Sequence, residues 1–132
     1  MRDDLSAVTF FKLIAVCALL VMLFTACDQR DERAALEMTG GVASRGPAAI
    51  QRYGCSTCHT VPGVSGANGL VGPPLSQVGS RVYLAGRLRN TPDNMIRWIR
   101  DPQGVDDKTA MPNLGVTEID AQDITSYLYT LK

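Results

Sequence analysis

Apolar residues recur at helical spacing in two stretches of the chain, and the segment before them lacks such a pattern. The two stripes consist of Met95, Ile96 and Ile99, and of Ile124, Tyr127, Leu128 and Leu131. Spacing of three and four residues predicts amphipathic helices that bury one face. From 61 to 79 the chain is rich in Gly, Pro, Ser and Val without a sustained helical period, which predicts a long loop.

Residues that start and stop helices agree with these stripes and predict an all-α domain. Pro47 suits a first helical position, and Gly54 suits a left-handed helix end. Thr91 can cap a helix that ends before Pro102. Thr117, with Asp120 three residues later, approximates a capping box for a last helix over about 118 to 131. We therefore expect three to five short helices.

The N-terminal part has the layout of an export signal. An uncharged apolar run extends from 13 to 26, and Arg2 and Lys12 precede it. The run is shorter than the roughly 20 residues that cross a bilayer as a helix, so export is favoured over a permanent span. Its end, Leu23 to Cys27, resembles the lipobox of bacterial lipoproteins. That resemblance implies a signal peptide over residues 1–26 and acylation of Cys27.

The segment that follows is expected to be a lipid-anchored flexible tether over residues 27–45. It is charged at first, then small and glycine-containing, as flexible linkers are. A short helix around 33–38 that packs on the domain is the alternative. Two other fates of Cys27 stay open, namely an uncleaved anchor and simple cleavage after Ala26. The folded domain is expected over residues 46–132.

Composition limits the classes of function. The chain has 132 residues, and its 13 basic residues balance 13 acidic ones. A balanced chain lacks the net positive charge that replaces counterions on nucleic acid, so we expect no nucleic-acid partner. The sequence also lacks a pairing of nucleophile and base, and its single histidine leaves no second imidazole for peroxide chemistry. We expect no small-molecule substrate and no catalytic residues.

The segment Cys55-Ser56-Thr57-Cys58-His59 carries the strongest chemical signal. In a Cys-x-x-Cys-His motif, two thiols on one helical turn can add to the two vinyl groups of a haem, and the adjacent histidine is directed at the iron. A structural zinc site needs four ligands, and the chain offers neither a second cysteine pair nor a second histidine. A thioredoxin-like redox pair would require strand patterns that the sequence lacks. The motif therefore predicts one covalent haem c.

From Gly46 to Lys132 the chain resembles class I cytochromes c, which carry one haem with His and Met axial ligands. The segment 72–75 matches their Gly-Pro-x-Leu pattern, which implies that the Pro73 carbonyl accepts the other ring N–H of His59. The segment 109–115 resembles the loop that presents the sixth ligand, which implies that Met111 binds the iron. Met95 is the competing methionine, but it belongs to the apolar stripe of a core helix. The resemblance implies a cytochrome c fold, wrapped around the haem.

The expected function follows from a haem iron whose two axial positions are both filled by protein ligands. Such an iron suits single-electron transfer, because its sixth position is filled. By analogy with cytochrome domains that work with haem-copper oxidases, the chain would carry electrons from a quinol-oxidising complex to a terminal oxidase. It would be exported and anchored at the periplasmic face of a bacterial cytoplasmic membrane. Two alternatives stay open: an electron-accepting subunit of a periplasmic dehydrogenase, and a sensor or enzyme with a labile Met111 bond.

Overall fold

The computed structural model describes residues 12–18 and 30–132, in two units that divide between Asp31 and Glu32. Residues 12–18 are helical. Within the described residues, no helix is both long and apolar enough to span a membrane. Cys27 lies outside the described residues, so its acylation stays a prediction.

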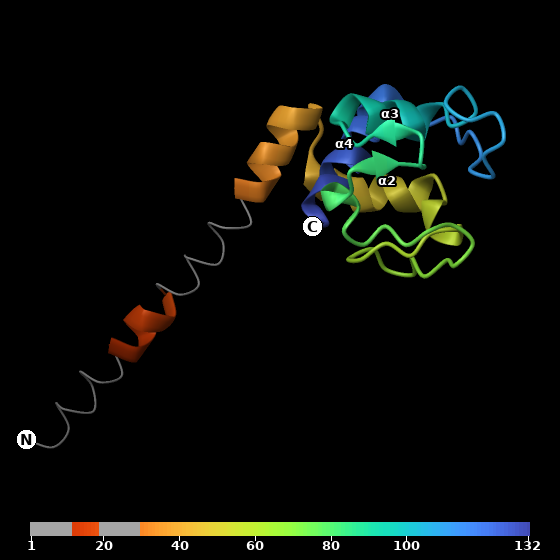
Figure 1. The fold of residues 1–132 in the computed structure, drawn as a ribbon. Helices are drawn as coiled ribbons and strands as arrows, with labels where there is room; N and C mark the ends of the chain where they lie inside the picture. The colour runs from red at the N-terminus through yellow and green to blue at the C-terminus, as the bar shows by residue number, and fades with distance from the viewer. Residues whose placement is uncertain (1–11, 19–29) are drawn as a thin grey trace, which may run out of the picture. The chain divides into compact units, whose positions relative to one another are not determined.

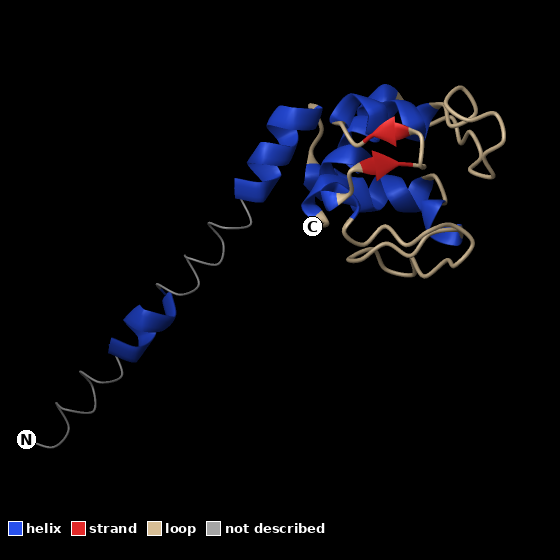
Figure 2. Ribbon diagram, viewed as in Figure 1, coloured by secondary structure: helices blue, strands red, loops and turns tan. Residues whose placement is uncertain are grey.

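The second unit is built mainly from helices (Figures 1 and 2). Residues 30–39 are helical. The elements after them are the 3₁₀ turn η1 (Ala43–Arg45), helix α2 (Gly46–Arg52), the 3₁₀ turns η2 (Cys55–Thr57) and η3 (Val78–Ser80), strands β1 (Tyr83–Leu84) and β2 (Leu88–Arg89), and helices α3 (Pro92–Arg100) and α4 (Glu118–Thr130). The expected architecture of short helices is confirmed, and the short antiparallel hairpin, which pairs Leu84 with Leu88, is an addition to it.

The helices begin and end within about one residue of the positions that the sequence indicated. The Thr91 hydroxyl oxygen accepts the Asn94 N–H at 3.3 Å at the start of α3. The Thr117 hydroxyl oxygen accepts the Asp120 N–H at 3.2 Å at the start of α4. Gly54 has a φ of 70°, in the left-handed region that glycine adopts at low cost, and it turns the chain from α2 into η2. These local signals set the direction of the chain ahead of Cys55.

The core forms where α4 packs against α2 and α3. Ile50 of α2, Met95 of α3, and Ile124 and Leu128 of α4 are all at most 3% exposed and belong to one cluster. Burying a side chain of this size stabilises a fold by about 1.5–3 kcal/mol. A Cβ on Gly46 would lie 2.3 Å from the Tyr127 Cβ, so the crossing of α2 and α4 leaves no room for a side chain there.

The structure differs from the predicted tether at its C-terminal end. Residues 30–39 are helical, as in the packed-helix alternative, and Thr39 and Ala43 are buried. The Val42 N–H donates to the buried Asp123 carboxylate at 2.7 Å. A Cβ on Gly41 would meet the α4 backbone at 2.1 Å. The chain from Thr39 onward therefore packs on α4 as part of the domain, because a small-residue segment can approach a helix backbone closely.

Two long loops connect these helices. Residues 58–77 join η2 to η3, and residues 101–117 join α3 to α4. In Figure 2 the first runs below α2, and the second extends beyond the end of α3. The first loop begins at Cys58 and contains His59 and Pro73. The second loop contains Met111. The helical core thus holds both candidate ligand segments at its edge.

Candidate functional site

Cys55 and Cys58 lie on one tight turn directly after α2. The Cys58 and His59 N–H groups both donate to the Cys55 carbonyl, at 3.2 and 2.9 Å. Both cysteines are free thiols and half-buried. Cys55 packs against the hydrophobic core, and this burial raises the pKa of its thiol, while a backbone hydrogen bond opposes the shift and the neighbouring Cys58 adds to it. The turn therefore presents two half-buried thiols, and that of Cys55 lies against the apolar core.

The His59 ring is held through one of its two nitrogens. Its Nδ1 lies 2.7 Å from the Pro73 carbonyl oxygen. Because a carbonyl can only accept, Nδ1 carries the proton and Nε2 keeps its lone pair. A held N–H on one side fixes the orientation of the ring and raises the basicity of the other nitrogen. His59 is thus prepared to bind a metal through Nε2.

Glycines let the following loop lie directly on the motif. A Cβ on Gly72 would stand 2.4 Å from the His59 Cε1, so the ring rests against the Gly72 backbone. A Cβ on Gly69 would stand 2.6 Å from the Cys58 carbonyl carbon. The Gly72 N–H also donates to the Cys58 carbonyl at 2.8 Å. These contacts bring Pro73 to His59 across 14 residues of sequence.

Met111 occupies the other loop and is half-buried. Its N–H donates to the Thr109 hydroxyl oxygen at 3.2 Å, and its carbonyl accepts from the Gln103 Nε2 at 2.7 Å. Met95, the competing methionine, is 2% exposed and lies in the core cluster. A side chain that fills the core is not available to a metal, whereas Met111 stands outside the core on a loop whose backbone is fixed.

A cluster of polar side chains joins the start of α4 to the end of α2. The Tyr53 and Thr117 hydroxyls each donate to the Asp120 carboxylate at 2.8 Å, and the Arg52 guanidinium lies 3.2 Å from it. The hydroxyl hydrogen bonds of Tyr53 and Thr117, followed by the charge of Arg52, hold the pKa of Asp120 below its ordinary value. The cluster connects the chain just before Cys55 with the exit of the Met111 loop. Sequence reasoning named Asp120 only as part of a capping box and missed its link to Tyr53.

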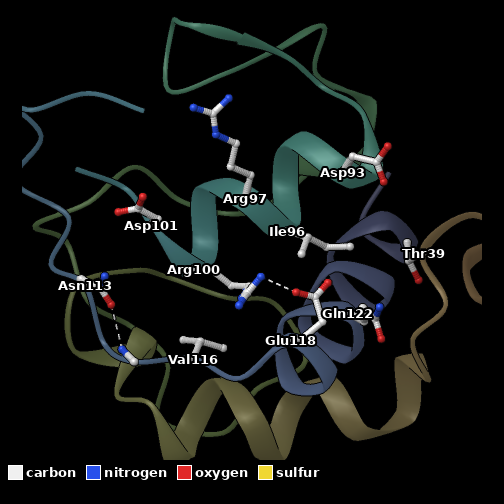
Figure 3. Close-up of a pocket in the computed structure, with 11 residues that line it drawn as sticks. Thr39, Asp93, Ile96, Arg97, Arg100, Asp101, Asn113, Val116, Glu118 and Gln122 are labelled. Atoms are coloured by element: carbon white, nitrogen blue, oxygen red, sulfur yellow. Dashed lines mark hydrogen bonds and ion pairs between the residues drawn. The ribbon is translucent and has the colours of Figure 1, made fainter. Parts of the chain in front are cut away.

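A groove of about 740 Å³ lies elsewhere, between α3 and the segment that leads into α4 (Figure 3). Its walls include Ile96, Arg97, Val116 and Gln122. An ion pair between Arg100 and Glu118 crosses it, as Figure 3 shows. None of the predicted site residues lines this groove. The lining therefore includes neither the cysteine turn nor Met111, although Asn113 belongs to the same loop as Met111.

Comparison with known proteins decides the family. Residues 43–132 match the family model described as cytochrome c. The chain belongs to the cytochrome c family. Subunit 2 of cytochrome c oxidase from Alkalihalophilus pseudofirmus is 34% identical over 97 residues, which cover 73% of this chain and 28% of that protein. The subunit from Bacillus sp. strain PS3 is 31% identical over 99 residues, with 72% and 28% covered. The chain thus spans under a third of the length of these relatives.

A cytochrome c carries a covalent haem c, and the residues of this cytochrome fit one. Cys55 and Cys58 offer two free thiols with the required spacing. The His59 Nδ1 is occupied by Pro73, which leaves Nε2 for iron. Within residues 12–18 and 30–132, no group of three or more His, Cys, Asp and Glu side chains could hold a bare metal ion. The two thiols and the free Nε2 are the donors that a covalent haem uses, and membership of the cytochrome c family supports electron transfer as the role of this chain.

Proposed function

We propose that this cytochrome is a membrane-tethered single-electron carrier with one haem c, attached through Cys55 and Cys58 and ligated by His59 and Met111. The observation that carries the proposal is the 2.7 Å hydrogen bond between the His59 Nδ1 and Pro73, next to two free thiols on one turn. When bound, haem c supplies a one-electron couple between ferrous and ferric iron. The chain's own residues determine how that couple is held and shielded.

His59 would hold the haem iron through Nε2, and Pro73 keeps the ring in one orientation. The Pro73 carbonyl accepts the Nδ1 proton and so fixes the tautomer in which Nε2 is free. The ring cannot slide toward the loop, because the Gly72 backbone already touches it. A ligand that needs no reorientation when the iron changes charge suits repeated electron transfer.

Met111 would hold the haem iron through its thioether sulfur, as the second protein ligand. A thioether is a soft ligand that favours the reduced metal, so it raises the reduction potential relative to a second imidazole. With this position filled, peroxide and oxygen have no open site. The fixed Met111 backbone supports this role, since both its N–H and its carbonyl are hydrogen-bonded.

The carrier is proposed to pass electrons from a quinol-oxidising complex to a terminal oxidase. The two relatives described above are subunits of cytochrome c oxidase, and this chain matches 28% of the length of each. Their similarity supports an oxidase as the acceptor. The lipobox-like segment before Cys27 supports acylation and residence at the periplasmic face of the cytoplasmic membrane. Acyl chains would keep the carrier near its membrane-bound partners.

An optical redox titration of the purified full chain tests the ligand set and the carrier role together. We expect a charge-transfer band from methionine to ferric iron, a clearly positive midpoint potential, and loss of the band in Met111→Ala but not in Met38→Ala, since Met38 is half exposed on the helix over 30–39. An absent band with a low potential would contradict the proposal and favour a sensor or enzyme with an open iron.

Replacement of Cys27 tests the anchor. Cys27→Ser should release the mature protein from membranes or leave an unprocessed precursor, because the acylated thiol is gone. Cys17→Ser is the matched control, since Cys17 is an exposed free thiol in the helical residues 12–18 and should leave processing unchanged. Membrane retention and processing of Cys27→Ser like the unaltered chain would refute the lipid anchor.

A further inference from the structure

The backbone of Met111 is held by side chains instead of by secondary structure. Among the described residues from 101 to 117, none lies in a helix or strand. The Met111 N–H donates to the Thr109 hydroxyl at 3.2 Å, two residues away, so this bond moves with the loop. Its carbonyl accepts from the Gln103 Nε2 at 2.7 Å, eight residues away. Of these two bonds, only the second connects Met111 to a distant part of the loop.

Gln103 is itself anchored to the end of α3. The preceding Pro102 is a fully buried side chain. On the other side, the Gly104 N–H donates to the Asp101 carboxylate at 3.1 Å, and the Gly104 carbonyl accepts from Arg97 of α3 at 3.3 Å. The Asp106 N–H closes the turn by donating to the Pro102 carbonyl at 2.9 Å. Gln103 therefore extends from a fixed turn, which makes its amide a defined point of attachment.

The direction of the bond between Gln103 and Met111 follows from the chemistry of the partner. A backbone carbonyl can only accept, so the atom of the amide that lies 2.7 Å from it must be the nitrogen. A hydrogen bond at the Met111 carbonyl restrains the peptide on which the side chain is mounted. Restraint of that peptide limits how far the Met111 Cα can move away without the bond breaking.

We propose that Gln103 is a positioning residue that holds Met111 in place as the axial ligand and limits access of small molecules to the iron. The inference rests on the proposed ligation by Met111. In this proposal, Met111 detaches as its loop moves away from the end of α3, and this motion breaks the hydrogen bond from Gln103. Without the bond, the state in which Met111 is detached from the iron becomes more populated. The apparent affinity for an external ligand rises in proportion to that population.

Cyanide titration of the oxidised, haem-loaded full chain provides the test. In Gln103→Leu, the cyanide concentration at half-saturation should fall roughly 2- to 10-fold, which corresponds to the loss of one ordinary hydrogen bond. Gln51→Leu is the matched control, because the Gln51 Nε2 also donates to a loop carbonyl, that of Ser65, at 3.1 Å. Gln51→Leu should leave cyanide binding unchanged. Its chemical unfolding midpoint should change by about as much as that of Gln103→Leu.

A second variant keeps the shape of the side chain. Gln103→Glu replaces the N–H donor by a carboxylate oxygen that cannot donate, so it should increase cyanide affinity at least as much as Gln103→Leu. Gln103→Lys restores a donor and should bring the affinity back toward that of the unaltered chain. Equal cyanide binding in the unaltered chain, Gln103→Glu and Gln103→Leu would overturn the inference.

Met111→Ala separates a failure of this inference from a failure of the proposed ligand. If Met111→Ala abolishes the charge-transfer band and Gln103→Leu behaves like Gln51→Leu, then Met111 is the ligand and Gln103 does not position it. If Met111→Ala leaves both the band and the cyanide affinity unchanged, then ligation by Met111 is refuted, and the role of Gln103 falls with it.

Discussion

Replacement of Gly72 by alanine tests whether the close contact with His59 controls the iron. The added Cβ would stand 2.4 Å from the His59 Cε1, 2.7 Å from Nδ1 and 2.9 Å from Nε2. Ordinary contacts begin near 3.4 Å, so the ring has to move by about 1 Å. A shift of this size away from the loop stretches the 2.7 Å hydrogen bond between the His59 Nδ1 and the Pro73 carbonyl beyond the usual limit of about 3.2 Å.

The displacement has two measurable effects. Overpacking costs about 1–3 kcal/mol, and for a domain of about 100 residues each kcal/mol lowers the unfolding temperature by roughly 4–8 °C. Loss of an outer partner of a ligating histidine changes metal affinity by about 10- to 100-fold. The bond to Pro73 makes the His59 Nε2 a stronger electron donor to the iron. Loss of this bond therefore reduces the stabilisation of ferric iron more than that of ferrous iron. The midpoint potential should therefore rise, by up to about 60–120 mV.

A spectroelectrochemical titration with thermal unfolding of the same samples measures both effects in Gly72→Ala. Gly79→Ala is the control, since its Cβ would crowd the Tyr129 carbonyl oxygen at 2.9 Å, away from His59. The control should lower the unfolding temperature without changing the potential. A Gly72→Ala protein whose potential is unchanged or lower than that of the unaltered chain would refute the argument that the Gly72 contact positions His59.

Three further predictions follow from the fold and the site. Replacing both Cys55 and Cys58 by serine should leave no haem on a denaturing gel, and haem retained there would contradict attachment at these thiols. Thr91→Ala should lower the unfolding free energy by about 1 kcal/mol, as loss of an N-cap does, measured by denaturant titration. Because hydrogen bonds lower the pKa of folded Asp120, its stabilisation is present at neutral pH and is lost as pH falls through that folded pKa. In Asp120→Asn, the unfolding free energy should fall less steeply as the pH is lowered. If it falls as steeply as in the unaltered chain, Asp120 does not contribute to the loss of stability in acid.

Features that depend on neighbouring residues could be predicted from the sequence. Thr91 and Thr117 cap their helices because a hydroxyl reaches an N–H three residues ahead, whatever the rest of the fold does. Gly54 was predicted as a left-handed helix end for the same local reason. The spacing of Cys55, Cys58 and His59 likewise specifies its chemistry within five residues.

Features that depend on distant residues could not be predicted. Nothing near Val42 in the sequence indicates that its N–H donates to Asp123, 81 residues later, so the packing of this segment on α4 leaves no local signal. The same holds for the bond between Tyr53 and Asp120 across 67 residues. A hydrogen bond between a side chain and a distant partner has no periodicity and no fixed spacing, so it leaves no pattern to detect.

The sequence by itself determined the helical class of this protein and the residues that make it a cytochrome, because capping, apolar periodicity and the Cys-x-x-Cys-His spacing act over a few residues. Only the tertiary structure decided how those residues are supported. It placed the Gly72 backbone against the His59 ring and Gln103 at the Met111 carbonyl. Both contacts depend on the paths of long loops, and those paths are set by packing against the helices and not by local preference.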